Sequence, residues 1–261
     1  MYDGPPTTLP EDLLLLLAHP RSGVLRPPRH FGRVLGGAVL TELMLTGAIS
    51  VDDTRILTVR KVRPADPFAG RVLNRMLRTR KDARSMRLER WVHRASGDRI
   101  VQVYLDALAE RGVVRRHTPS FLGLFASATW RAVDPGGHAD LVARIDRAVR
   151  PKAHGAVPGP PDVRGPHLAA LAGVSRLNRR LDAEWWRLGI RILLRDLTRA
   201  TPIAEATRRV VQADRRRGGG GGDWNPGEWT SPVSGNEGWS DGGGGGSDGG
   251  GGGGDGGGGG D

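Results

Sequence analysis

The hydrophobic positions between residues 8 and 217 recur mainly at the three- and four-residue spacing of amphipathic helices. Thr8 is a suitable N-cap for the first helix, which ends before Pro20, and Gly47 is a suitable C-cap for the second. The two prolines in residues 21–30 predict a turn-rich loop between these helices. The predicted helices cover residues 8–19, 31–46, 68–81, 84–94, 99–112, 137–149, 167–197 (broken near Gly189) and 202–214.

Two stretches change to the pattern of short strands. Residues 49–51 and 56–59 flank a polar turn and predict one hairpin, and residues 113–114 and 121–125 predict a second. The sequence therefore predicts a mainly α fold, a single helical domain with two short β-hairpins. Each hairpin follows an apolar helix and a glycine, which is also the outline of a winged helix, so that fold remains an alternative.

Composition divides the 261-residue chain into unlike parts. Residues 218–261 contain 24 glycines, seven acids and no Lys or Arg, for a net charge of −7. The remaining residues carry a net charge of +18. We therefore predict a flexible N-terminus at 1–7, a folded domain at 8–217 and a disordered Gly/Asp/Trp tail at 218–261.

Several classes of protein are excluded by composition. The chain has no cysteine, so it has no disulfide, thiolate nucleophile or Cys-ligated metal, which suits a reducing cytoplasm. The apolar run at 13–17 follows two acids and does not resemble a secretory signal. The longest apolar stretch, residues 34–49, contains Glu42 and is too short to span a bilayer. We expect a buried helix there.

Motifs for catalysis and metal binding are not found. The chain contains no phosphate-loop, nucleophile-elbow or His-Glu-x-x-His pattern, and no two of its seven histidines are three or four residues apart. Gly32, Gly36 and Gly37 lie within an apolar helix, which favours close helix packing over nucleotide binding. We predict a protein that is not an enzyme and that has no metal site and no cofactor.

Basic residues are densest between residues 55 and 116, which hold 17 Lys and Arg against six acids. Arg71, Arg75 and Arg78 share one helical stripe in this region. A face of like charge repels itself and attracts anions. Three interpretations fit: an ordinary solvated face, a surface for phosphate or anionic lipid, and a surface for nucleic acid.

Five segments, in order and at matching spacing, resemble the Golgi phosphoprotein 3-like family, including its bacterial and especially actinobacterial members. The similarity covers roughly residues 8–215, and the tail lies outside it. The segments are residues 9–17 (LPEDLLLLL), 39–49 (VLTELMLTGAI), 57–62 (LTVRKV) with 66–70 (DPFAG), 108–114 (LAERGVV) and 121–125 (FLGLF).

The resemblance implies a function at membranes. Eukaryotic members are peripheral Golgi proteins that bind phosphatidylinositol 4-phosphate in a basic pocket and meet the cytosolic tails of glycosyltransferases. Their second hairpin serves self-association. The resemblance therefore implies a protein client and a homo-oligomer for this chain as well. The corresponding hairpin residues in this chain are Val113, Val114, Phe121, Leu122, Leu124 and Phe125.

The four positions of the family's headgroup pocket do not match. Pro27 stands near the place of an aromatic residue, and Gly36, Asp98 and Val101 stand near the places of basic residues. Other arginines lie close by in the sequence and are our candidates for a substitute headgroup site. They are Arg26, Arg29, Arg33, Arg94 and Arg99.

The sequence therefore predicts a non-enzymatic peripheral membrane protein at the cytoplasmic face of a membrane. Its expected partners are anionic phospholipid or phosphoinositide headgroups. The alternative is a winged-helix-like nucleic-acid-binding or regulatory protein. The helix before the first hairpin is almost wholly apolar, which is typical of a buried helix and unsuited to reading base edges, so nucleic acid is the less favoured partner.

Overall fold

A computed structural model describes residues 7–79, 84–97, 99–117, 129–134, 136–150, 161–175 and 188–217. Contacts between Cα atoms divide the chain into Met1–Thr230 and Ser231–Asp261, and every described residue belongs to the first unit. The described residues form nine α-helices and two small antiparallel sheets, so the prediction of a mainly α fold is confirmed. The predicted tail lies outside the described residues.

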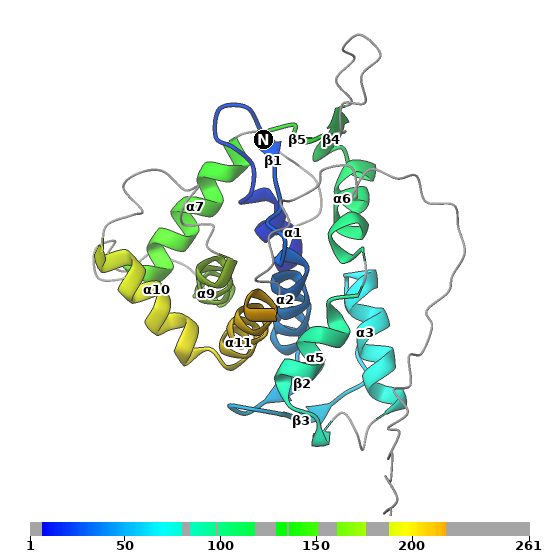
Figure 1. The fold of residues 1–261 in the computed structure, drawn as a ribbon. Coiled ribbons are helices and arrows are strands. Elements are labelled where there is room, and N and C mark those ends of the chain that lie inside the picture. The colour runs from blue at the N-terminus through cyan, green and yellow to red at the C-terminus, as the bar shows by residue number, and fades with distance from the viewer. Residues whose placement is uncertain are drawn as a thin grey trace, which may run out of the picture. The chain divides into compact units, whose positions relative to one another are not determined.

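The helices and strands follow one another through the chain as shown in Figure 1. The helices are α1 (Leu9–Leu15), α2 (Phe31–Leu45), α3 (Pro67–Arg78), α5 (Leu88–Ala95), α6 (Ile100–Glu110), α7 (Gly136–Val149), α9 (Gly165–Ser175), α10 (Leu188–Ala200) and α11 (Pro202–Arg217). The strands are β1 (Val24–Leu25), β2 (Ile49–Val51), β3 (Ile56–Val59), β4 (Val114–His117) and β5 (Thr129–Ala132).

Capping residues mark the helix ends, at Thr8 and Gly47 as predicted and at Asp66, which the sequence analysis did not name. Thr8 is the N-cap of α1, and its N–H donates to the Glu11 carboxylate at 2.7 Å. Asp66 caps α3 by accepting from the Phe68 N–H at 2.7 Å. Gly47 follows α2 with φ +70°, in the left-handed region that favours glycine.

The first hairpin has the predicted strands, and the second contains a strand that the sequence did not predict. β2 and β3 pair antiparallel around the polar turn. β4 pairs with β5. The predicted return strand at 121–125, with Phe121, Leu122, Leu124 and Phe125, lies outside the described residues. β5 also pairs with β1, a strand inside the stretch that we expected to be only a loop. The two-residue length of β1 gives no alternating pattern to detect.

The predicted helix over 167–197 is described only in part. α9 is described as far as Ser175 and α10 from Leu188, and residues 176–187, which border the predicted break near Gly189, lie outside the described residues. α7 faces the core with Ile145 and Val149, which are buried, and with Leu141, which packs against the core.

α2 is the central element of the domain (Figure 1), and it packs against α1, α3, α5, α6, α9 and α11. Its buried positions continue around the helix and include ten of its 15 residues. A helix that is buried on all sides cannot lie in a DNA groove. The observation removes the main structural reason for the winged-helix alternative. No helix in the described part of the chain is long and apolar enough to cross a membrane.

Two glycines of α2 allow the close packing that the sequence predicts. A Cβ atom at Gly36 would lie 2.7 Å from the Val92 carbonyl oxygen of α5 and 2.4 Å from the Ser96 hydroxyl. A Cβ atom at Gly37 would lie 2.2 Å from the Thr207 hydroxyl of α11. These glycines bring α5 and α11 against α2, so the packing interpretation is confirmed over the nucleotide-loop interpretation.

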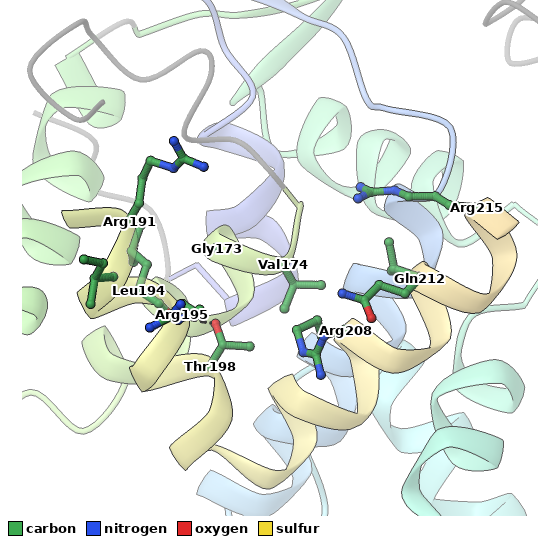
Figure 2. Close-up of a pocket in the computed structure, with 11 residues that line it drawn as sticks. Gly173, Val174, Arg191, Leu194, Arg195, Thr198, Arg208, Gln212 and Arg215 are labelled. Atoms are coloured by element: carbon green, nitrogen blue, oxygen red, sulfur yellow. Dashed lines mark hydrogen bonds between the residues drawn. The ribbon is translucent and has the colours of Figure 1, made fainter. Parts of the chain in front are cut away.

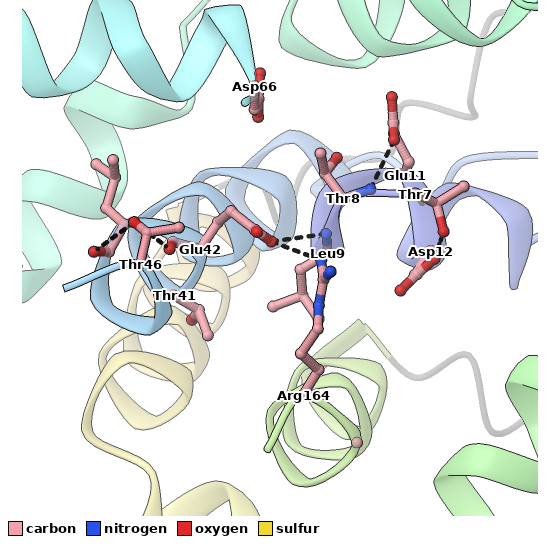
Figure 3. Close-up of polar contacts among 12 residues, drawn as sticks. Thr7, Thr8, Leu9, Glu11, Asp12, Thr41, Glu42, Thr46, Asp66 and Arg164 are labelled. Carbon is pink, nitrogen blue, oxygen red and sulfur yellow. Dashed lines mark hydrogen bonds and ion pairs between the residues drawn. The ribbon is translucent and has the colours of Figure 1, made fainter. Parts of the chain in front are cut away.

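Acidic side chains fix α1 to its neighbours (Figure 3). The Glu42 carboxylate of α2 accepts from the Leu9 N–H at 2.9 Å and from Arg164 at 2.8 Å. Asp12 accepts from the Thr7 hydroxyl and lies 3.7 Å from Arg144. Its side chain is almost fully buried, and this burial raises the pKa of Asp12 to about 6. These buried acids are explained by structural contacts between helices.

Candidate anion-binding site

Three helix ends meet where α2 begins. The packing at Gly36 places the last turn of α5 beside α2, and a Cβ atom at Gly32 would lie 3.3 Å from the Ile100 side chain at the start of α6. The Nε of Arg33 donates to Asp214 of α11 at 2.8 Å, so the end of α11 lies beside the start of α2. The N-terminal ends of α2 and α6 and the C-terminal ends of α5 and α11 therefore meet here, so their helix dipoles oppose one another and the side chains set the charge of the junction.

Basic side chains gather at this junction. We call Arg29, His30, Arg33, His93 and Arg94 the α2 basic cluster. Arg29, His30 and Arg33 come from the start of α2, and His93 and Arg94 come from the last turn of α5. The sequence candidates included the three arginines but neither histidine, because no local spacing relates His30 to His93.

The surroundings lower the pKa of both histidines. Burial lowers the pKa of His30, and nearby arginines, including Arg29 and Arg33, lower it further against the opposing effect of Asp214. Burial also lowers the pKa of His93, and Arg33 is the next largest cause. Arg33 therefore acts on both histidines. The lowered pKa values favour the neutral imidazoles, so the arginines carry most of the positive charge of this cluster, and Asp214 offsets part of it.

The five predicted arginines differ in how the structure holds them. Arg33 is ion-paired with Asp214, and the Arg94 guanidinium lies 5.5 Å from the centre of the buried Trp91 ring, a cation–π contact. Arg26, Arg29 and Arg99 are exposed.

The backbone of Arg99 is unusual, because it adopts a left-handed conformation with φ +77° at the start of α6. Such a conformation turns the chain sharply between α5 and α6.

The five arginines do not line a common cavity. A cavity of about 310 Å³ opens beside the start of α2, and Arg29 is the one predicted arginine in its wall. The opposite wall carries Arg215 of α11, which the sequence analysis did not single out. The remaining lining residues are Pro28, His30, Phe31, Val34, Ser175 and Val211.

A second cavity of about 310 Å³ lies between α9, α10 and α11 (Figure 2) and shares Val211 and Arg215 with the first. No acidic residue lines either cavity among the described residues. The wall of the second cavity is apolar on the α9 side and carries arginines from α10 and α11. These arginines are Arg191, Arg195, Arg208 and Arg215.

Nearby acids neutralise part of this charge from outside the cavity. Glu205 forms a two-bond ion pair with Arg208 at 2.6 Å and also accepts from Arg209. The hydrogen bonds from Arg208 are the main cause that lowers the pKa of Glu205. Asp196 lies 3.3 Å from Arg195, and both side chains are exposed, so this pair is weak.

The described residues contain no group of three His or acidic side chains that could hold a metal ion. The buried acids near α1 form contacts between elements of the core. Glu11 accepts from Arg111, and Asp66 accepts from the Tyr104 hydroxyl in the core. Burial raises the pKa of Asp66, and the Tyr104 hydrogen bond opposes that rise.

The fold and this site define a mainly helical protein with a central buried helix and a basic junction at its first turn. The family model described as Golgi phosphoprotein 3 (GPP34) matches residues 9–213. The chain therefore belongs to the Golgi phosphoprotein 3 family, and the resemblance found in the sequence is confirmed. No curated protein matches the chain.

Proposed function

We propose that this member of the family is a non-enzymatic peripheral membrane protein that binds anionic lipid headgroups through the α2 basic cluster. The observation that supports the proposal is that Arg29 and Arg33 lie near His30, and Arg33 also near His93, at the start of the central helix. A phosphate group has the charge and the acceptor oxygens that guanidinium groups bind. The proposal places the protein at the cytoplasmic face of a membrane.

Electrostatics sets the expected strength. Each Lys or Arg near an anionic membrane contributes about 1 kcal/mol, and the effect falls off within a Debye length of about 8 Å at physiological salt. Reversing two exposed arginines at the site should therefore weaken binding by at least about tenfold. If the whole basic domain attracts the membrane diffusely, charge reversal at any exposed arginine should weaken binding by the same amount.

The proposal extends to protein partners in two respects. An adaptor role would bring a protein client to the membrane, and self-association would use Val113 and Val114 with the hairpin residues beyond the described part of the chain. Val114 is buried in β4, so it supports the hairpin rather than offering a free surface. Both partner roles remain expectations of the family resemblance.

Co-sedimentation with vesicles tests lipid binding. The full chain would be mixed with vesicles of phosphatidylcholine alone, with added phosphatidylglycerol, or with added phosphatidylinositol 4-phosphate, at low and high salt. We expect recovery with both anionic preparations and its loss at high salt. Equal recovery with neutral and anionic vesicles at low salt would refute the proposal.

Matched charge variants locate the binding site. R26E/R29E reverses two exposed arginines before α2, and R63E/R78E reverses two exposed arginines before and at the end of α3. The two variants have the same net charge. We expect R26E/R29E to lose far more binding than R63E/R78E. Equal losses would show diffuse attraction and contradict a site at the α2 basic cluster.

A further inference from the structure

The cavity between α9, α10 and α11 forms a basic surface. We call it the arginine groove and define it by Arg191, Arg195, Arg208, Arg215 and Val211. Val211 and Arg215 also line the cavity beside Arg29. Arg208 and Arg195 pair with Glu205 and Asp196 outside the lining, and the lining itself carries four arginines and no acid, so we expect an anionic occupant.

The groove also has an apolar component. Val174, Leu194 and Val211 form part of its wall, and Ile192 on its edge is 41% exposed. A large exposed aliphatic side chain beside arginines favours an occupant that combines negative charge with an apolar or aromatic group. Tryptophan suits such a wall because its ring packs on aliphatic groups and accepts cation–π contacts from arginine.

Residues 223–229 (DWNPGEW) of the same chain have this combination. Asp223 and Glu228 supply two negative charges, and Trp224 and Trp229 supply two aromatic rings. Neither Lys nor Arg occurs in this segment or anywhere after Arg217. Its charge is opposite to that of the groove.

The chain connection brings the segment close to the groove. α11 ends at Arg217, two residues beyond Arg215, and five glycines at 218–222 follow. A flexible glycine linker of this length has an end-to-end distance of about 13 Å. Arg208 lies about 14 Å back along α11 from Arg217. The segment therefore reaches the groove, at an effective concentration in the millimolar range.

We propose that residues 223–229 bind in the arginine groove of their own chain, with the carboxylates of Asp223 and Glu228 on its arginines and the tryptophan rings on its apolar wall. The occupied groove would cover Arg215, which also lines the cavity beside Arg29. Tail binding would then compete with external anions at that end of the cavity. The contact itself needs no membrane, so its test is independent of the proposed lipid binding.

The absence of cysteine allows a unique spin label. T230C in the full chain would carry a nitroxide one residue after the segment, and amide signals would be compared with the label oxidised and reduced. We expect strong loss of intensity in α10, at residues 191–198, and recovery of those signals at 0.5 M salt. The end of α11 is not informative, because the tether alone keeps the label near it.

Two controls separate binding from tethering. D223N/E228Q in the same labelled chain keeps the tether and removes the charges, and it should restore the α10 signals. R191E/R195E should restore them too, whereas R63E/R78E, with the same net charge, should not. Unchanged spectra from R63E/R78E outside the substituted sites would confirm that charge reversal of this size preserves the fold.

The outcomes that overturn the proposal are distinct. Intensity loss in α10 that persists in D223N/E228Q would reflect the tether and not binding. Loss centred on other arginines, such as those at 55–78, would place the tail on another face. Shifts of groove amides on adding sodium sulfate, without any label effect in α10, would show that the groove takes small anions and not the tail.

Discussion

The packing of α5 on α2 through Gly36 makes a measurable prediction, which G36A tests. An alanine Cβ would lie 2.7 Å from the Val92 carbonyl oxygen, well inside an ordinary contact. That oxygen is part of the α5 backbone, so the helix itself must shift by several tenths of an ångström. The Ser96 hydroxyl cannot turn away freely, because it donates to the same Val92 oxygen.

Two effects of opposite sign decide the result. Alanine is favoured over glycine inside a helix by about 1 kcal/mol. Overpacking a rigid interior costs about 1–3 kcal/mol, with the larger values where backbone must move. We expect the overpacking to exceed the gain, so that G36A lowers the free energy of unfolding by about 1–2 kcal/mol.

G70A is the matched control. Gly70 lies inside α3, and a Cβ atom there would meet no atom within 4 Å. The helix-propensity gain of up to about 1 kcal/mol should therefore appear undiminished. Equilibrium urea unfolding of the full chain, followed by circular dichroism, gives both values. If G36A is as stable as G70A, the close approach of α2 and α5 is wrong.

Two further predictions concern buried acids. Y104F removes the hydroxyl that donates to the buried Asp66, so we expect it to lower the free energy of unfolding by about 1–3 kcal/mol at neutral pH in urea titrations; an unchanged midpoint would contradict that bond. Burial raises the pKa of Asp12 from 3.8 to about 6, so the folded state binds the carboxyl proton more tightly than the unfolded state does. The contribution of this proton to the free energy of unfolding is therefore complete below pH 4 and is lost as the pH rises through 6. D12N removes this dependence, so its stability relative to the natural chain should rise by up to about 3 kcal/mol between pH 4 and pH 7.5. An equal difference at both pH values would contradict the assigned pKa.

Local sequence signals predicted most of the helices because each signal acts over a few residues. The N-cap at Thr8 and the glycine at Gly47 set helix ends through bonds and backbone angles in one turn. The strand β5 was not predicted, because the pairing of strands is a long-range choice. β5 is separated from β4 by residues 118–128, and no rule of local spacing selects it over 121–125.

The sequence predicted only some residues of the candidate site. Arg29 and Arg33 could be named because they lie close to the family's pocket positions. His93, Asp214 and Arg215 could not, because their relation to α2 depends on how α5 and α11 pack against it. No sequence motif links the arginines of the groove, because they come from two separate helices, α10 and α11.

The sequence by itself determined the mainly helical class, the family, the basic domain and the acidic glycine-rich tail. These properties depend on composition, periodicity and ordered motifs, which are all present in the linear chain. Only the tertiary structure decided which charges act together. Gly36 and Gly37 remove the side chains that would hold α5 and α11 away from α2, and this close packing brings the helix ends with their arginines to one junction.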